Sequence, residues 1–388
     1  MNPKIVSIDL TPIHVPFRKE TREVMESGEG SLGMAIPSEE PWTGADFVIC
    51  RITTSDGSIG VADVLLWLPE DGLLPENVIN SVEKGFGKYF LGENPFNIRR
   101  IHDRLDRNVA RNEIEKGLLE NACYDLMGKI INRPACDLMG GKSVDRIPLA
   151  VLVPLTDLNT MVTYAKFFYN SGYKSFRYKL GSNIIEDVEI SKTLREVFGP
   201  KVRLRVDYNQ AYRPAEAVQA IKSIEPYDID YAEQPVSKND FLGMAYVQKR
   251  VDTPLMAHES FFSLNDFATL VELRAVGVLG INCGRPGGII NSLKAIDYAE
   301  QRGLGVVVHD QSLGISAAML IHLVAAKYHS INHDTELFGH MMLEDDLIVK
   351  KLEFKKGMVK VPEGPGWGVQ LDEEALEKYA TGPTIFLE

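Results

Sequence analysis

Three carboxylates stand at equal intervals along the chain, and each ends a short run of apolar or β-branched residues. Asp207 follows VRLRV, Glu233 follows IDYA and Glu259 follows TPLMAH. Both intervals are 26 residues (233 − 207 and 259 − 233), which suits one strand plus one helix of a repeating βα barrel. Three acids at one barrel end would repel one another without a cation between them. The pattern therefore predicts a site for Mg²⁺, with Mn²⁺ as the alternative.

The third ligand position has two candidates, because neighbours on a strand point to opposite faces and only one of them can face the cation. The preference of Mg²⁺ for oxygen favours Glu259. An inward His258 would instead indicate a softer metal such as Mn²⁺, Fe²⁺ or Zn²⁺. Asn209, two residues beyond Asp207, shares its side of the chain and is expected to bind the substrate or to support the metal ligands.

Basic groups end two other runs. Arg177 and Lys179 lie two residues apart in SFRYK, so both would enter the same barrel mouth. Apolar walls and a positive neighbour favour the neutral form of Lys179, which can remove a proton, while Arg177 would bind a substrate carboxylate. His309 ends GVVVH. A lone histidine is more often a hydrogen-bonded core residue, but this one would share the mouth with Lys179.

The elements that position these residues alternate between strand and helix from Ile147 onward. Eight strand-like runs occur in order: PLAVLV, SFRYKL, VRLRVD, IDYAEQ, PLMAHE, VGVLGIN, GVVVHD and HSINHDTE. They predict an α/β fold, a modified (β/α)₈ TIM barrel with its chemistry at the carboxyl ends of the strands. We assign the barrel to residues 140–349.

An α+β capping domain is predicted over residues 1–139, completed by 350–388. Residues 4–17 and 46–64 have the pattern of antiparallel strands, with a hairpin turn at 55–57. A helical region follows over 75–139, and Gly128 is expected to weaken its last turn.

Residues 18–45 show neither helical nor strand periodicity, which predicts a long loop. This loop contains Gly28-Glu29-Gly30-Ser31-Leu32-Gly33, a match to the dinucleotide-binding pattern GxGxxG. The match lacks the strand before it and the amphipathic helix after it that such a site needs. We interpret it as a loop and not as a nucleotide site.

Composition excludes several classes of partner. The 388 residues carry a formal net charge of −12, which argues against nucleic acid or an anionic membrane as a partner. The four cysteines form no CxxC pair, and the N-terminus lacks the pattern of a secretory signal, so we expect a cytoplasmic protein. The longest apolar stretch, residues 315–326, is too short to span a membrane and predicts a buried helix.

Six segments in this order resemble the enolase superfamily, specifically its mandelate racemase and muconate lactonizing enzyme branch: SFRYKLG, VDYNQAY, DYAEQPVS, TPLMAHES, TELFG and GPGWGVQLDEEAL. The resemblance covers nearly the whole chain. It implies a capping domain over the barrel and Mg²⁺ held by Asp207, Glu233 and Glu259. It also implies that Lys179 removes the proton α to a carboxylate and leaves an enediolate. The expected partner is a small-molecule carboxylate substrate, and the expected assembly is a homo-oligomer.

The departures from this branch concern the second proton-transfer group. The lysine-x-lysine motif begins here with Arg177, and Asn282 stands where the lactonizing enzymes carry a second lysine. His309 resembles the second acid–base group of the racemases and acid-sugar dehydratases, in which an aspartate pairs with the histidine. Asn282 is expected to pair with His309 without supplying charge. Glu336, in TELFG, is expected to bind the substrate carboxylate.

Specificity in this family comes from capping loops, which correspond here to residues 18–45 and 64–73. Trp42 and Trp67 lie in these segments and are expected to contact an apolar part of the substrate. Packing within the lid explains them equally well.

The predicted reaction is abstraction of a proton by Lys179 and delivery of one by His309. Delivery to the other face of the enediolate gives racemisation or epimerisation, and delivery to a departing hydroxyl gives dehydration. Cycloisomerisation of the lactonizing type is an alternative. Two further alternatives are a metal-independent aldolase in which Lys179 forms a Schiff base, and a barrel without catalytic activity.

Overall fold

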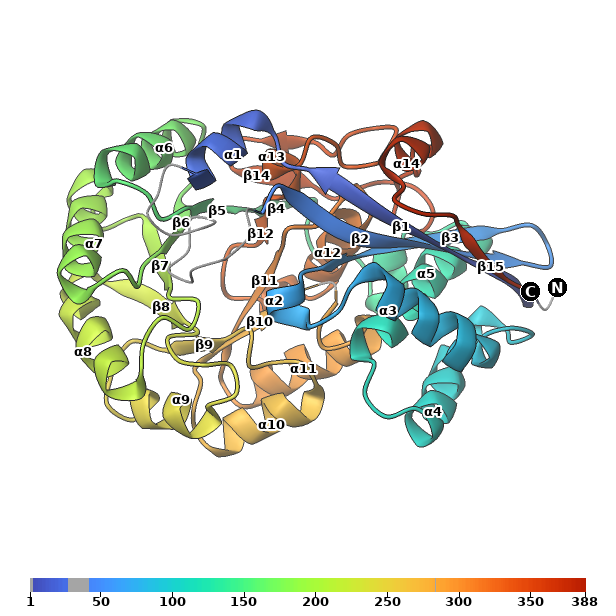
Figure 1. The fold of residues 1–388 in the computed structure, drawn as a ribbon, viewed down its shortest axis with the longest axis horizontal. Helices are drawn as coiled ribbons and strands as arrows, with labels where there is room; N and C mark the ends of the chain where they lie inside the picture. Colours follow the sequence, from blue (N-terminus) through green and yellow to red (C-terminus); the bar gives the residue numbers. More distant parts are fainter. Residues whose placement is uncertain (1–2, 27–41, 283) are drawn as a thin grey trace.

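The computed structural model describes residues 3–26, 42–282 and 284–388. Figure 1 shows a barrel ringed by helices, with a second sheet and its helices lying beside it. The glycine-rich segment 28–33, interpreted above as a loop, lies outside the described residues.

The capping sheet has four strands in the order β15-β1-β2-β3. All its pairings are antiparallel. The predicted hairpin turn is present, and Gly57 adopts a φ of 82°, a left-handed conformation that costs glycine little. The strands are β1 (Ile5–Pro16), β2 (Gly44–Thr54), β3 (Ile59–Leu66) and β15 (Ile385–Leu387).

Helices cover this sheet where a helical region was predicted: α3 (Pro75–Asn80), α4 (Ile98–Asn108) and α5 (Glu113–Ile130). Helix α5 is buried over most of its length. It ends two residues beyond Gly128, so Gly128 lies in its last turn, and the expected weakening of that turn stays a prediction. A Cβ at Gly128 would lie 2.7 Å from the backbone of Gly366, and this glycine therefore permits a close approach of two chain segments.

The second sheet is a ring of eight parallel strands in sequential order, which confirms the predicted barrel. A bridge between Leu149 and Thr335 links the first and last strands, and the Ala150 N–H donates to the Thr335 carbonyl at 2.9 Å. The strands are β5 (Ala150–Val153), β6 (Ser175–Lys179), β7 (Arg203–Asp207), β8 (Ile229–Glu233), β9 (Leu255–Ala257), β10 (Val278–Ile281), β11 (Gly305–Asp310) and β12 (Glu336–Leu337).

Seven helices alternate with these strands and form the outer ring of the barrel (Figure 1). They are α6 (Leu158–Asn170), α7 (Ile184–Phe198), α8 (Pro214–Ile224), α9 (Phe241–Gln248), α10 (Leu264–Glu272), α11 (Ile289–Gln301) and α12 (Gly314–Ala326). Helix α12 is the buried helix predicted from the apolar stretch. No helix in the described part of the chain is long and apolar enough to cross a membrane.

Two predictions of secondary structure were wrong. Strand β12 has two residues, because most of HSINHDTE lies in a 3₁₀ turn (Tyr328–Ser330) and a loop. The Asn332 side chain holds this loop by accepting from the Val306 N–H at 3.2 Å. The segment predicted to be structureless begins with a helix, α1 (Lys19–Glu26).

Buried hydrogen bonds join the capping sheet to the barrel. The Ser316 N–H on α12 donates to Asp63 Oδ1 on β3 at 2.8 Å, and its hydroxyl donates to the Asp63 carbonyl at 2.7 Å. The Trp367 indole N–H, in the C-terminal segment, donates to the Val61 carbonyl at 3.0 Å. Since these polar groups are paired away from water, they fix the capping sheet against the barrel.

Candidate active site

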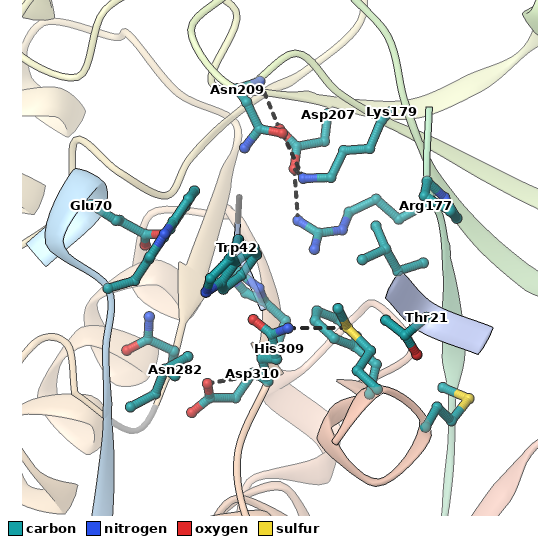
Figure 2. A pocket seen from close by; sticks show the side chains of 18 of the residues that line it. Thr21, Trp42, Glu70, Arg177, Lys179, Asp207, Asn209, Asn282, His309 and Asp310 are labelled. Carbon is teal, nitrogen blue, oxygen red and sulfur yellow. Dashed lines mark hydrogen bonds and ion pairs between the residues drawn. The ribbon is translucent and has the colours of Figure 1, made fainter. Parts of the chain in front are cut away.

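A cavity of about 390 Å³ lies between the capping domain and the carboxyl ends of the barrel strands. Figure 2 shows side chains from both parts pointing into it. The predicted site residues on its wall are Trp42, Trp67, Arg177, Lys179, Asp207, Asn209, Asn282 and His309.

The register of the barrel strands places the carboxylates of Asp207 and Glu233 at the same height in the barrel. Lys179 pairs with Asp207 across β6 and β7, and Asp207 pairs with Glu233 across β7 and β8. Strand β9 ends at Ala257, so His258 and Glu259 lie in the turn beyond it. Alternation holds only while the chain stays extended, so it does not decide between them, and which of the two faces a cation stays a prediction.

Arg177 joins three carboxylates. Its Nη1 lies 3.0 Å from Asp207 Oδ2 and 2.6 Å from Glu233 Oε2, and its Nε lies 2.8 Å from Glu336 Oε2. Burial by itself would lower the pKa of Arg177, but these acids raise the pKa well above its usual value. The guanidinium is therefore charged at the floor of the cavity.

Lys179 is paired on the same floor. Its Nζ lies 2.6 Å from Asp207 Oδ2 and donates to Asn209 Oδ1 at 2.6 Å. The amide of Asn209 in turn donates to Glu259 Oε1 at 3.2 Å. Asn209 has a φ of 43°, and its own N–H donates to Asp207 Oδ1 at 2.9 Å. Asn209 thus links the lysine to two of the predicted metal ligands.

The pKa values of the buried acids shift in different directions. Burial opposes ionisation of Asp207, but Lys179 and Arg177 outweigh it and lower the pKa of Asp207. For Glu233 burial prevails over the attraction of Arg177, and the pKa is raised well above its usual value. Burial and the charge of Asp207 likewise raise the pKa of Glu259. Extra positive charge in this site would therefore stabilise the ionised acids.

Glu336 contacts Arg177 and does not line the cavity. Its Oε1 accepts from Arg205 Nη1 at 3.0 Å and from the Tyr231 hydroxyl at 3.3 Å, and its side chain is fully buried. This geometry does not support the expected contact of Glu336 with the substrate carboxylate. It supports a role in holding Arg177.

Asn282 does not pair with His309 within the described residues. Its Oδ1 accepts from the N–H groups of Gly284 and Arg285 at 3.0 and 2.8 Å, and its Nδ2 lies 3.5 Å from His258 Nε2. The physical reason is local, because an asparagine at a turn satisfies the N–H groups that follow it.

His309 contacts His258 through its ring, with centroids 4.1 Å apart at an interplanar angle of 62°. Its Nε2 is buried and has no hydrogen-bond partner among the described residues. Burial, and then the neighbouring His258, lower the pKa of His309 well below its usual value. Both effects favour the neutral form of the ring, in which Nε2 is available to accept a proton.

Two residues at the site, Arg285 and Glu70, were not predicted from the sequence. Arg285 Nη2 lies 2.8 Å from His258 Nε2, and the same atom is paired with Glu70. Glu70 belongs to the short helix α2 (Leu68–Asp71) of the capping domain. A charged residue just beyond the end of β10 was the signal that could have identified Arg285. Nothing in the sequence pattern marks Glu70.

Aromatic side chains form the capping side of the cavity. Trp42 and Trp67 stack with ring centroids 4.8 Å apart at an interplanar angle of 15°, and Phe17 packs edge-on against Trp42. Other apolar lining residues come from the barrel: Leu152, Tyr164, Phe167, Phe168, Phe338, Met341 and Met342. The cavity wall therefore combines charged residues, including Glu20, Glu70 and Asp71 of the capping domain, with a large group of apolar side chains.

The site fits a divalent cation. Glu233 Oε1 and Glu259 Oε2 are buried oxygens without a hydrogen-bond partner in the described part of the chain. One ligand atom each from Glu233, His258 and His309 lies within 4.8 Å of the others. Buried unpaired acid oxygens are costly, and a bound cation would remove that cost.

Two family models match this architecture. The model of the mandelate racemase / muconate lactonizing enzyme N-terminal domain matches residues 3–140, and the model described as enolase C-terminal domain-like matches residues 160–375. The chain belongs to the mandelate racemase and muconate lactonizing enzyme subgroup of the enolase superfamily. It is therefore an enzyme, and members of this subgroup with stated activities include the isomerases that follow.

Three such relatives are similar over most of the chain. N-succinyl-L-Arg/Lys racemase of Bacillus cereus is 28% identical over 97% of both chains. Its crystal structure has a TM-score of 0.89 at 26% identity and covers 99% of this chain and 100% of its own. Hydrophobic dipeptide epimerase of Enterococcus faecalis is 32% identical over 75% of this chain and 82% of its own. Chloromuconate cycloisomerase of Cupriavidus pinatubonensis is 27% identical over 86% and 91%.

Proposed function

We propose that this enzyme is a racemase or epimerase that exchanges the proton α to the carboxylate of a small substrate through an enediolate. The observation that carries the proposal is the presence of two proton-transfer groups, Lys179 and His309, on the wall of one cavity. They come from β6 and β11, which lie three strands apart around the closed ring. Figure 2 shows them on different sides of the cavity, as a reaction at both faces of one carbon requires.

Whether Lys179 or His309 acts as the base or the acid would depend on which of them carries the proton. The neutral ring of His309 can accept the α-proton of one enantiomer, while Lys179, ion-paired with Asp207, delivers a proton to the opposite face. The opposite enantiomer would use the same groups with their roles exchanged. General acid and base groups typically contribute about 10²–10⁴-fold each.

The remaining residues would bind and orient the substrate. Arg177 and Asn209, on the wall of the cavity, are suited to contact the carboxylate, and Glu336 holds Arg177. Asp207, Glu233 and Glu259 are the acids that surround the proposed cation site. When bound, the cation supplies positive charge that stabilises the negative charge developing on the substrate.

The apolar lining of the cavity supports a substrate with an apolar group. Trp42 and Trp67 would pack against that group, whose burial is favourable by about 25 cal/mol per Å² of apolar surface. The names of two relatives, N-succinyl-L-Arg/Lys racemase and hydrophobic dipeptide epimerase, indicate N-substituted amino acids. We therefore propose an N-acyl or N-peptidyl amino acid with an apolar portion.

Proton exchange in D₂O tests the proposal directly. Separate enantiomers of N-acyl amino acids, dipeptides, α-hydroxy acids and sugar acids would be incubated with enzyme and a divalent cation. Mass spectrometry and chiral chromatography would then report deuterium uptake and inversion. Deuterium uptake with inversion is expected, whereas loss of water or ring closure would identify a dehydratase or a cycloisomerase instead.

A substitution at His309 tests whether the two faces of the substrate α-carbon are served by different proton-transfer groups. His309→Asn should suppress exchange of one enantiomer by about 10²–10⁴-fold while Lys179 still exchanges the other. His329→Asn, at an exposed histidine in the 3₁₀ turn Tyr328–Ser330, is the matched control. Equal loss for both enantiomers, or no exchange with any acid, would refute the two-base assignment.

A further inference from the structure

We propose that the cation site of this chain is a mixed carboxylate and imidazole site. His258 supplies a nitrogen ligand, Glu233 and Glu259 supply oxygen ligands, and the site prefers Mn²⁺, Fe²⁺ or Zn²⁺ to Mg²⁺. The inference rests on the proposed function, since it concerns the same cavity, but it makes a separate statement about metal choice.

His258 lies close to two of the predicted acid ligands. His258 Nδ1 lies 3.4 Å from Glu233 Oε1 and 3.6 Å from Glu259 Oε2. These separations are too long for good N–H···O hydrogen bonds. Adjacent ligands of one ion, with bonds of about 2.1 Å at angles of 90–110°, lie about 3.0–3.5 Å apart. His258 Nδ1 is therefore close to ligand spacing from each of the two acid oxygens.

The carboxylate oxygens of the site differ in their hydrogen bonding. Glu233 Oε1 and Glu259 Oε2 are both buried without a hydrogen-bond partner in the described chain, and both face His258 Nδ1. The oxygens of Asp207 are engaged, because Oδ2 is paired with Arg177 and Lys179 and Oδ1 accepts from the Asn209 N–H. An ion at His258 would use free atoms, whereas an ion on Asp207 would compete with two cationic side chains.

The other ring nitrogen of His258, Nε2, has polar neighbours of its own. Arginine carries only donors, so His258 Nε2 accepts from Arg285 and the proton of the neutral ring resides on Nδ1, between the two acids. A cation on Nδ1 would move that proton to Nε2, so the contact of Nε2 with Arg285 would have to give way to a contact with a carboxylate. Glu70 Oε1 lies 3.4 Å from Nε2. This carboxylate can accept an Nε2–H, as carboxylates beside metal-bound histidines commonly do.

Metal preference follows from ligand type. Mg²⁺ is a hard cation that takes oxygen ligands in a strict octahedron, whereas imidazole nitrogen suits Mn²⁺, Fe²⁺ and Zn²⁺. Replacing the nitrogen by oxygen should therefore shift selectivity toward Mg²⁺.

Pulsed electron paramagnetic resonance of bound Mn²⁺ provides a readout independent of turnover. Metal-free enzyme loaded with Mn²⁺ should show coupling to a directly bound ¹⁴N nucleus, which changes to ¹⁵N coupling in protein labelled with ¹⁵N-histidine. The coupling should disappear in His258→Asp and persist in the matched control His329→Asp. Absence of nitrogen coupling in the wild-type enzyme would overturn the proposal even if the variant failed to fold.

Titration calorimetry measures the selectivity of the site for Mn²⁺ over Mg²⁺. The ratio of Mn²⁺ to Mg²⁺ affinity should fall at least tenfold in His258→Asp and stay unchanged in His329→Asp. An unchanged ratio in both variants would also overturn the proposal. Deuterium exchange without nitrogen coupling would leave the proposed reaction standing and remove only the ligand assignment, whereas nitrogen coupling without exchange would do the reverse.

Discussion

Substitution of Glu336 tests whether a side chain outside the cavity organises the site. Glu336 is fully buried between two arginines, with Arg205 Nη1 at 3.0 Å and Arg177 Nε at 2.8 Å. Glu336→Gln keeps the shape of the side chain and removes its charge. Removing one partner of a buried ion pair typically costs about 3–5 kcal/mol. Because Arg177 keeps Asp207 and Glu233, we expect about 3 kcal/mol, at the lower end of that range.

The matched control is Glu373→Gln, which removes a carboxylate paired with Arg51 at 2.9 Å on the surface, where 59% of the Glu373 side chain is exposed. Such pairs contribute about 0–1 kcal/mol. The free energy of unfolding would be measured for both variants by urea denaturation, and KM by deuterium exchange. A looser Arg177 should raise KM about tenfold, which corresponds to about 1.4 kcal/mol of binding free energy. Equal destabilisation by the two substitutions, or an unchanged KM in Glu336→Gln, would refute the reasoning.

Three further predictions concern the base, the aromatic wall and a buried histidine. Lys179→Ala should lower proton exchange of at least one enantiomer by about 10²–10⁴-fold while calorimetry still detects cation binding. Trp67→Ala should raise KM about tenfold for substrates with an aromatic group and leave KM for small aliphatic acids nearly unchanged. Burial lowers the pKa of His322 from 6.5 to about 4, so the unfolded chain takes up this proton first. Stability should be complete above pH 6.5 and fall by up to about 3 kcal/mol toward pH 4, and pH-dependent urea denaturation should show a smaller fall in His322→Gln.

The strand-end residues were predictable because a βα repeat fixes their phase. Lys179, Asp207 and Glu233 end consecutive strands and are register partners, so residues that end successive strand-like runs lie at the same height in the barrel. The alternation of side chains along each strand then placed Arg177 on the same side as Lys179.

Other parts of the site depend on contacts between distant segments, which spacing does not record. Glu70 meets Arg285 only because a capping segment docks on the barrel. Glu336 faces Arg177 because the ring closes and β12 lies next to β5. The partners of Asn282 were missed for the opposite reason, since its amide is satisfied by the turn that immediately follows it.

The attachment of the capping sheet has a consequence for how molecules enter and leave. Asp63 anchors that sheet to helix α12 at a site without access to water. Helix α2 has only four residues, none of them buried, and its polar links to the barrel run through Lys238 and Arg285. Exchange of substrate for product should therefore depend on displacement of this single helical turn, and its rate should set an upper limit on turnover.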